Sequence, residues 1–99
     1  MKNQWELKKG GELLGVLTEQ NIHQPWINCK FQASPAFALY EGLFAEEIRL
    51  LNRDEMELRQ QAYQKIDELE LALEPLNEGG ETIKDFILHI DGDRAQFRY

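Results

Sequence analysis

The sequence of 99 residues has a single cysteine, three prolines and no long apolar run. With only Cys29 present, an internal disulfide and a zinc site built on several cysteines are both excluded. No apolar stretch approaches the roughly 20 residues that cross a bilayer as a helix. Basic residues are also scarce: 11 Lys and Arg stand against 18 Asp and Glu, which gives a net charge of −7. This balance disfavours a nucleic-acid partner, whose phosphate backbone calls for a basic surface.

Hydrophobic residues make up 42% of the chain, which is typical of a folded globular protein. At this length we expect one domain spanning residues 1–99. Twelve acidic and four basic residues lie between Glu41 and Glu81, against six and seven in the rest of the chain. We interpret this segment as helical, with acidic pairs such as Glu46-Glu47 in solvent. We expect a cytoplasmic protein without a membrane partner, since no apolar leader is visible.

Residues 86–99 consist of two alternating runs that meet at Asp91-Gly92-Asp93, and an Asp-Gly pair in this position predicts a tight hairpin. A loop of Asp91-Gly92 or of Gly92-Asp93 keeps the same residues matched, because the two registers differ by two residues. The apolar face of this hairpin holds Phe86, Leu88, Ile90, Ala95, Phe97 and Tyr99. The opposite face holds Asp85, Ile87, His89, Arg94, Gln96 and Arg98.

Residues 5–17 predict another hairpin, turning at Gly10-Gly11. Its expected cross-strand pairs are Lys9 with Glu12, Leu7 with Leu14 and Trp5 with Val16. This register leaves Leu13 and Leu17 on the other face. Residues 18–25 have no period and predict a loop. Residues 26–33 alternate again, with Cys29 on the apolar side and Trp26 on the open side.

Ser34-Pro35 predicts a helix start, with Ser as the N-cap and Pro in the first turn. Apolar residues then recur at spacings of three and four, at Phe37, Tyr40, Phe44, Ile48 and Leu51. A second helix begins near Asp54 and extends to about Leu73, because Pro75 disfavours a helical residue before it.

Together these elements predict an α+β fold in the order β-β-β-α-α-β-β. We expect an antiparallel sheet of about five strands with two helices packed on one face, since each helix has an apolar stripe to bury. The ending from His89 to Tyr99, with Ser34-Pro35-Ala36-Phe37 opening a helix, resembles that of small uncharacterised bacterial single-domain proteins. The resemblance implies a bacterial cytosolic protein and carries no site residues with it.

The sequence predicts no catalytic residue and no cofactor, so we expect a protein that is not an enzyme. Cys29 and His89, the residues for nucleophilic catalysis, fall on opposite faces of the sheet. His89, Asp91 and Asp93 have metal-ligand chemistry, but both Asp residues flank the Gly of a turn, where Asp is favoured for its backbone preferences. We therefore expect no metal site.

The open sheet face is the most promising candidate for a function, because apolar and aromatic residues there mix with Lys and Arg. Its candidate interface residues are Leu13, Leu17, Trp26, Ile87, His89, Arg94 and Arg98. We expect a non-enzymatic protein-protein interaction module that docks a protein partner or forms a homodimer through this face. One alternative is an acidic inhibitor or immunity-type protein that binds a basic enzyme through its helical face. Another is a small enzyme or ligand binder with a cleft between sheet and helices.

Overall fold

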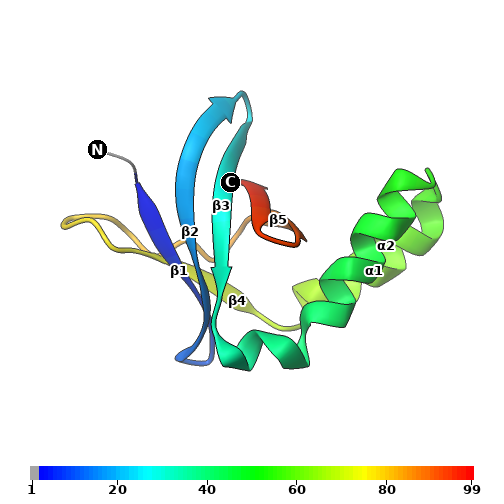
Figure 1. Ribbon diagram of the computed structural model, residues 1–99, viewed down its shortest axis with the longest axis horizontal. Helices are drawn as coiled ribbons and strands as arrows, with labels where there is room; N and C mark the ends of the chain where they lie inside the picture. The colour runs from blue at the N-terminus through cyan, green and yellow to red at the C-terminus, as the bar shows by residue number, and fades with distance from the viewer. Residues whose placement is uncertain (1–2) are drawn as a thin grey trace.

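A computed structural model describes residues 3–99, and within this range six strands form one antiparallel sheet with two α-helices beside it (Figure 1). The strands are β1 (Gln4–Lys9), β2 (Glu12–His23), β3 (Trp26–Ala33), β4 (Leu71–Pro75), β5 (Ile87–Asp91) and β6 (Arg94–Arg98). The helices are the 3-10 helix η1 (Pro35–Leu39), α1 (Glu41–Asn52) and α2 (Met56–Asp67). The order across the sheet is β4-β1-β2-β3-β6-β5. The predicted α+β class with an antiparallel sheet is confirmed, with one strand more than expected.

The additional strand is β4, which lies in a stretch that the sequence analysis assigned to the second helix. Helix α2 ends at Asp67, and Glu70 follows with a φ of 53°, a left-handed conformation that a right-handed helix does not contain. Leu71 and Leu73 are then buried on one side of a strand that pairs with β1. The alternation of these leucines was the signal for a strand. Pro75 suits the position, because β4 is at the edge of the sheet.

The N-terminal hairpin turns at Gly10-Gly11 as predicted, and both glycines have positive φ. A β-bulge then shifts the register by one residue between Leu7 and Lys8. The pairs that follow are Leu7 with Gly15 and Trp5 with Leu17, so the expected pairings of Leu7 with Leu14 and of Trp5 with Val16 are both wrong. Because one inserted residue moves every later side chain to the other face, Leu17 lies in the core and not on an open face.

Strand β2 continues to His23, where the sequence analysis expected a loop from residue 18. It pairs with β3 up to a tight turn at Gln24-Pro25, and the two strands form a long hairpin. The C-terminal hairpin turns at Gly92-Asp93, one of the two predicted registers. Gly92 has a φ of 63°, and glycine at the first central position is typical of a type II′ turn.

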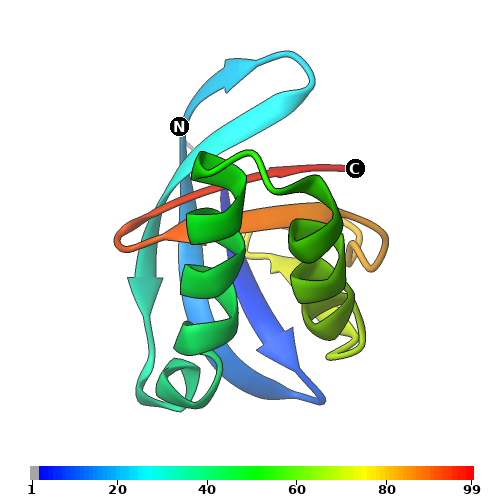
Figure 2. The ribbon, with the colours of Figure 1, turned by 90° about the vertical axis from the view of Figure 1, so that its right-hand side faces the viewer.

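The sheet curls so that β5 lies between the other strands and the helices. Figure 1 shows β5 between β3 and the helix pair, and Figure 2 shows the β5–β6 hairpin crossing behind the helices. Leu88 and Ile90 are buried on one side of β5, facing the core residues of the curled sheet. His89 is also buried, on the other side, where α1 packs. Both faces of β5 are therefore covered, although its sequence alternates like a half-buried strand.

The helices are tied to the sheet by a series of aromatic rings. The Phe31 and Phe37 ring centroids are 5.0 Å apart, and those of Phe37 and Phe44 are 5.5 Å apart. A helix begins at Pro35 as predicted, but the expected single helix to Leu51 is divided, since the 3-10 helix η1 ends at Leu39 and α1 begins at Glu41. Ser34 makes no side-chain cap and donates its hydroxyl hydrogen bond to the Leu13 carbonyl. Within residues 3–99, neither helix has the length and apolarity that crossing a membrane requires.

Phe97 tests the position of the core, since it is fully buried and meets the Trp5 ring edge-on at a centroid distance of 4.9 Å. Replacing Phe97 with Ala should lower the free energy of unfolding by about 3–5 kcal/mol, as for other large-to-small core changes. Urea denaturation measures this loss. The control is Leu39→Ala, at a residue 78% exposed, which should change stability by no more than about 0.5 kcal/mol. Equal midpoints for the two variants would show that Phe97 is outside the core.

Candidate ligand-binding cleft around His89

The structure separates the residues that the sequence analysis grouped into one open-face interface. Leu17 is fully buried and His89 is 6% exposed, so neither belongs to a free surface. The bulge turns Leu17 inward, and α1 covers His89. The remaining five fall into two groups: Leu13, Trp26 and Ile87 are half-buried, and Arg94 and Arg98 are exposed. Because two of the seven candidate residues are buried, the expected continuous surface patch does not form.

His89 is buried against a carboxylate of helix α1. Its Nδ1 lies 2.7 Å from Oε1 of Glu47, which is fully buried. The sequence predicts that Glu46 and Glu47 both lie in solvent, and for Glu47 this prediction is wrong. The signal was in the helical spacing: Glu47 is three residues from both Phe44 and Leu50, which are the other buried residues of α1. A buried polar pair joins α1 to β5.

The pair fixes the orientation of the imidazole ring. An ionised carboxylate only accepts hydrogen bonds, so while Glu47 is ionised the Nδ1 of His89 carries the ring proton. In a neutral ring the second nitrogen, Nε2, then carries no proton. It can accept a hydrogen bond or a proton. No hydrogen bond among the described residues uses Nε2.

The second oxygen of Glu47 has a weaker partner. Oε2 lies 3.7 Å from Nε of Arg59, which is an ion-pair distance but too long for a hydrogen bond. Within residues 3–99, Oε2 is the one buried side-chain nitrogen or oxygen atom without a hydrogen bond. Its charge keeps the Arg59 side chain, which is 31% exposed, close to the His89 site.

Two aromatic side chains frame the His89 ring. Its centroid is 5.3 Å from that of Trp26 and 6.1 Å from that of Tyr63. The Arg98 guanidinium lies 5.5 Å over the Trp26 ring, a cation–π distance that fixes this exposed side chain. The Tyr63 hydroxyl accepts a hydrogen bond of 2.8 Å from the Leu88 N–H, and burial raises the pKa of Tyr63 above its usual value.

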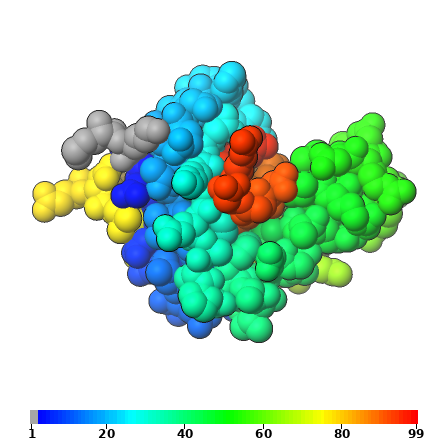
Figure 3. All heavy atoms as spheres, in the orientation of Figure 1, coloured from blue at the N-terminus to red at the C-terminus, as the bar shows by residue number. Residues whose placement is uncertain are grey.

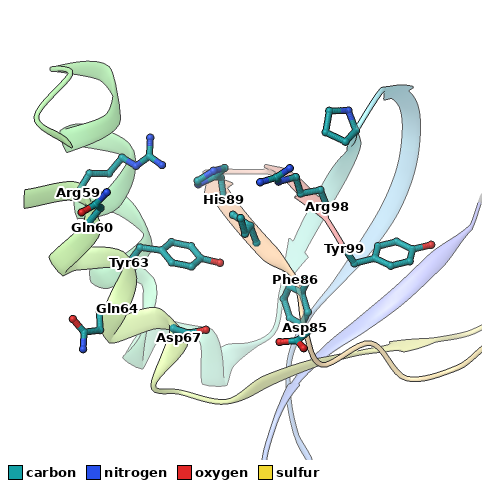
Figure 4. A pocket seen from close by; sticks show the side chains of 12 residues that line it. Arg59, Gln60, Tyr63, Gln64, Asp67, Asp85, Phe86, His89, Arg98 and Tyr99 are labelled. Carbon is teal, nitrogen blue, oxygen red and sulfur yellow. The ribbon is translucent and has the colours of Figure 1, made fainter. Parts of the chain in front are cut away.

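His89 borders a cleft of about 590 Å³ between α2 and the β5–β6 hairpin, which we call the helix–hairpin cleft (Figure 4). Its lining comes from Pro25, Arg59, Gln60, Tyr63, Gln64, Asp67, Asp85, Phe86, Ile87, His89, Arg98 and Tyr99. Figure 3 shows the orange-to-red C-terminal hairpin at the surface, between the remaining strands and the green helices. The residues that line the cleft therefore come from parts of the chain that are distant in sequence.

A second cleft, of about 820 Å³, lies on another side of His89. It is bordered by β2, β3, β6 and the end of α1, and its polar lining includes Asn21, Asn28, Lys30, Asn52, Asp93 and Gln96. Arg94, an interface candidate, also lines it. Among the described residues, no group of three or more His, Cys, Asp and Glu side chains is placed to hold a metal ion.

Cys29 borders the second cleft without offering a reactive thiol. It is 3% exposed, and burial raises its pKa from 9.0 to about 12, with Glu19 adding to the shift. In the register, Cys29 is opposite Ala95 while His89 is opposite Gln96, so the two side chains lie on different faces.

No family model, curated protein or solved structure matches the chain. The fold and the cleft therefore define it as a small α+β protein with a curled antiparallel sheet and a buried Glu–His pair.

Removing the Glu47 carboxylate should destabilise the protein, because it leaves the Nδ1–H of buried His89 without an acceptor. For Glu47→Ala we expect the free energy of unfolding to fall by at least about 1–3 kcal/mol. Glu47→Gln keeps an acceptor oxygen and should cost less. The matched control is Glu46→Ala at the exposed neighbouring position, where the loss should stay below about 1 kcal/mol. If both alanine variants lose the same small amount in urea titrations, the pair does not tie α1 to β5.

The raised pKa of Cys29 predicts slow thiol labelling. At pH 8 the shift from 9.0 to about 12 lowers the thiolate fraction by about two to three orders of magnitude. Reaction with Ellman's reagent should be slower by at least this factor in the native protein than in the urea-unfolded chain. Native labelling at the unfolded rate would place Cys29 outside the core.

Proposed function

We propose that this protein binds a small anionic ligand in the helix–hairpin cleft. The observation that carries the proposal is that two guanidinium groups, those of Arg59 and Arg98, line this cleft beside the buried His89–Glu47 pair. Guanidinium groups suit carboxylate and phosphate groups, since their planar N–H donors can form paired hydrogen bonds.

The charges at one end of the cleft suit an anion, although the whole chain carries −7 and Asp67 and Asp85 line the other end (Figure 4). Glu47 is fully buried and already accepts from His89, so its oxygens do not line the cleft. Arg98 has no carboxylate within ion-pair distance among the described residues, and it is held over Trp26.

Binding is better supported than covalent catalysis. The described lining residues of the helix–hairpin cleft include no Ser, Thr, Cys or Lys that could act as a nucleophile beside His89. The raised pKa of Cys29 also leaves the second cleft without an activated thiol.

The helix–hairpin cleft is one of the alternatives that the sequence raised, a binding site between sheet and helices. The sheet-face interface is less well supported, since Leu17 and His89 are buried and Trp26 packs against His89. Self-association through the remaining exposed residues stays a prediction that sedimentation can test.

Benzoate, benzylamine and benzyl alcohol test the proposal, because they share a ring and differ in charge. Benzoate should bind with a Kd of about 1 mM or below, as measured by isothermal titration calorimetry. Benzylamine and benzyl alcohol should bind at least tenfold more weakly. Arg98→Gln should weaken benzoate binding by about tenfold, since it removes a guanidinium that faces the cleft.

The control for this variant is Arg53→Gln, which removes the same charge from an exposed residue outside both clefts. It should leave benzoate affinity within about twofold, because screening weakens distant surface charges. If the two Arg variants weaken benzoate binding equally, the effect comes from net charge and not from the cleft. Tighter binding of benzylamine than of benzoate would reject an anion site.

A further inference from the structure

The walls of the helix–hairpin cleft carry chemically similar residues in the same order. On α2, Arg59, Tyr63 and Asp67 recur every four residues and line one face of the helix. On the hairpin side, His89, Ile87 and Asp85 recur every two residues along β5 and the segment before it. Each row passes from a nitrogen-bearing group to a carboxylate, with the Tyr63 ring or the Ile87 side chain between them.

The two rows also have similar lengths. Arg59 and Asp67 are eight residues apart, which is about 12 Å along a helix. Asp85 and His89 are four residues apart, at most about 13 Å in an extended chain. Figure 4 shows Arg59, His89 and Arg98 at one end of the cleft and Asp67 and Asp85 at the other, with Tyr63 and Phe86 between them. The cleft is thus divided into a cationic end and an acidic end.

Groups of the same charge type come from opposite walls at each end. Asp67 belongs to α2 and Asp85 to the hairpin side, and neither forms a salt bridge with a described residue. At the other end Arg59 belongs to α2 and Arg98 to the hairpin side, and Arg59 also lies 3.7 Å from the buried Glu47 carboxylate. A ligand with an anionic group at one end and a cationic group at the other would match the charges of both ends.

The remaining lining residues indicate what should join these two ligand groups. Gln60 and Gln64 line the cleft from adjacent turns of α2, about 5–6 Å apart, with Gln60 beside Arg59 and Gln64 near Asp67 (Figure 4), and each offers an amide donor and an amide acceptor. In an extended peptide, backbone groups that point to one side repeat every two residues, or about 6.6–7 Å. Tyr63 and Phe86 supply apolar surface beside them. This combination suits peptide bonds with small apolar side chains.

We infer that the helix–hairpin cleft takes a short peptide of three or four residues with free termini. Its carboxylate lies between Arg59 and Arg98 near His89, and its ammonium lies between Asp67 and Asp85. An extended peptide of three or four residues spans about 10–14 Å, which matches the separation of the two ends. The inference rests on the proposed anion site and adds the second charge, the length and the peptide backbone.

The test uses Ala-Leu-Ala in four forms: with free termini, N-acetylated, C-amidated and blocked at both ends. Calorimetric titration of the whole chain should give the tightest binding for the free form. Acetylation and amidation should each weaken it by at least tenfold, because each removes one of the two charges. The dipeptide Ala-Leu, which cannot reach both ends, should also bind at least tenfold more weakly than the free tripeptide.

Variants assign each terminus to its end of the cleft. In Asp67→Asn/Asp85→Asn, acetylation should no longer matter, whereas amidation should still weaken binding. In Arg98→Gln the effect of amidation should shrink and that of acetylation should remain. Glu57→Gln, an exposed change on α2 outside both clefts, should leave all four affinities unchanged.

The outcomes separate this inference from the proposed function. If benzoate binds but free and acetylated Ala-Leu-Ala bind equally, the anion site stands and the peptide inference is overturned. If neither benzoate nor the free peptide binds at 10-fold the expected Kd of about 1 mM, both are overturned. If a free amino group strengthens binding equally in wild type and in Asp67→Asn/Asp85→Asn, the acidic end is not its site and the inference is overturned.

Discussion

The hydrogen bond between Glu47 and His89 joins the helical layer to the sheet and sets the chemistry of the cleft. A fully buried carboxylate is costly to desolvate, so it persists only where donors compensate for the lost water. Here Nδ1 of His89 lies 2.7 Å from one carboxylate oxygen, and Nε of Arg59 lies 3.7 Å from the other. Because α1 supplies the acid and β5 the imidazole, a shift between the layers would break this pair. The ring therefore occupies a fixed position between Trp26 and Tyr63.

The position of β5 explains why a single strand serves both the core and the cleft. One of its sides packs into the curled sheet through Leu88 and Ile90, and the other meets α1 through His89. The adjacent α2 is not packed as closely along this hairpin, and the cleft of about 590 Å³ lies between them. Residues that precede β5 and follow β6, Asp85 and Tyr99, complete its walls. Stability and the candidate function thus depend on the same hairpin from opposite sides.

Net charge describes this protein poorly at the scale of a site. The segment from residue 41 to residue 81 carries most of the negative charge, yet it supplies Arg59 to the cationic end of the cleft as well as Asp67 to the acidic end. At an ionic strength of about 0.1–0.15 M, dissolved ions screen charges that are more than about 8–10 Å apart, so a ligand in the cleft responds mainly to the nearest groups. An acidic chain can therefore offer an anion site.

The sequence by itself determined the glycine turns, the alternating strands and the α+β class, because these follow from local backbone preference and period. It also held the signals for β4 and for buried Glu47, in the alternation of Leu71 and Leu73 and in the spacing from Phe44. Only the tertiary structure shows that both faces of β5 are covered and that a bulge in the N-terminal hairpin buries Leu17. Alternation assigns residues to two faces of a strand, but packing of distant segments decides whether one face or both are removed from water. The cleft could not be predicted from the sequence, because its walls are brought together only by the curl of the sheet and the docking of α1.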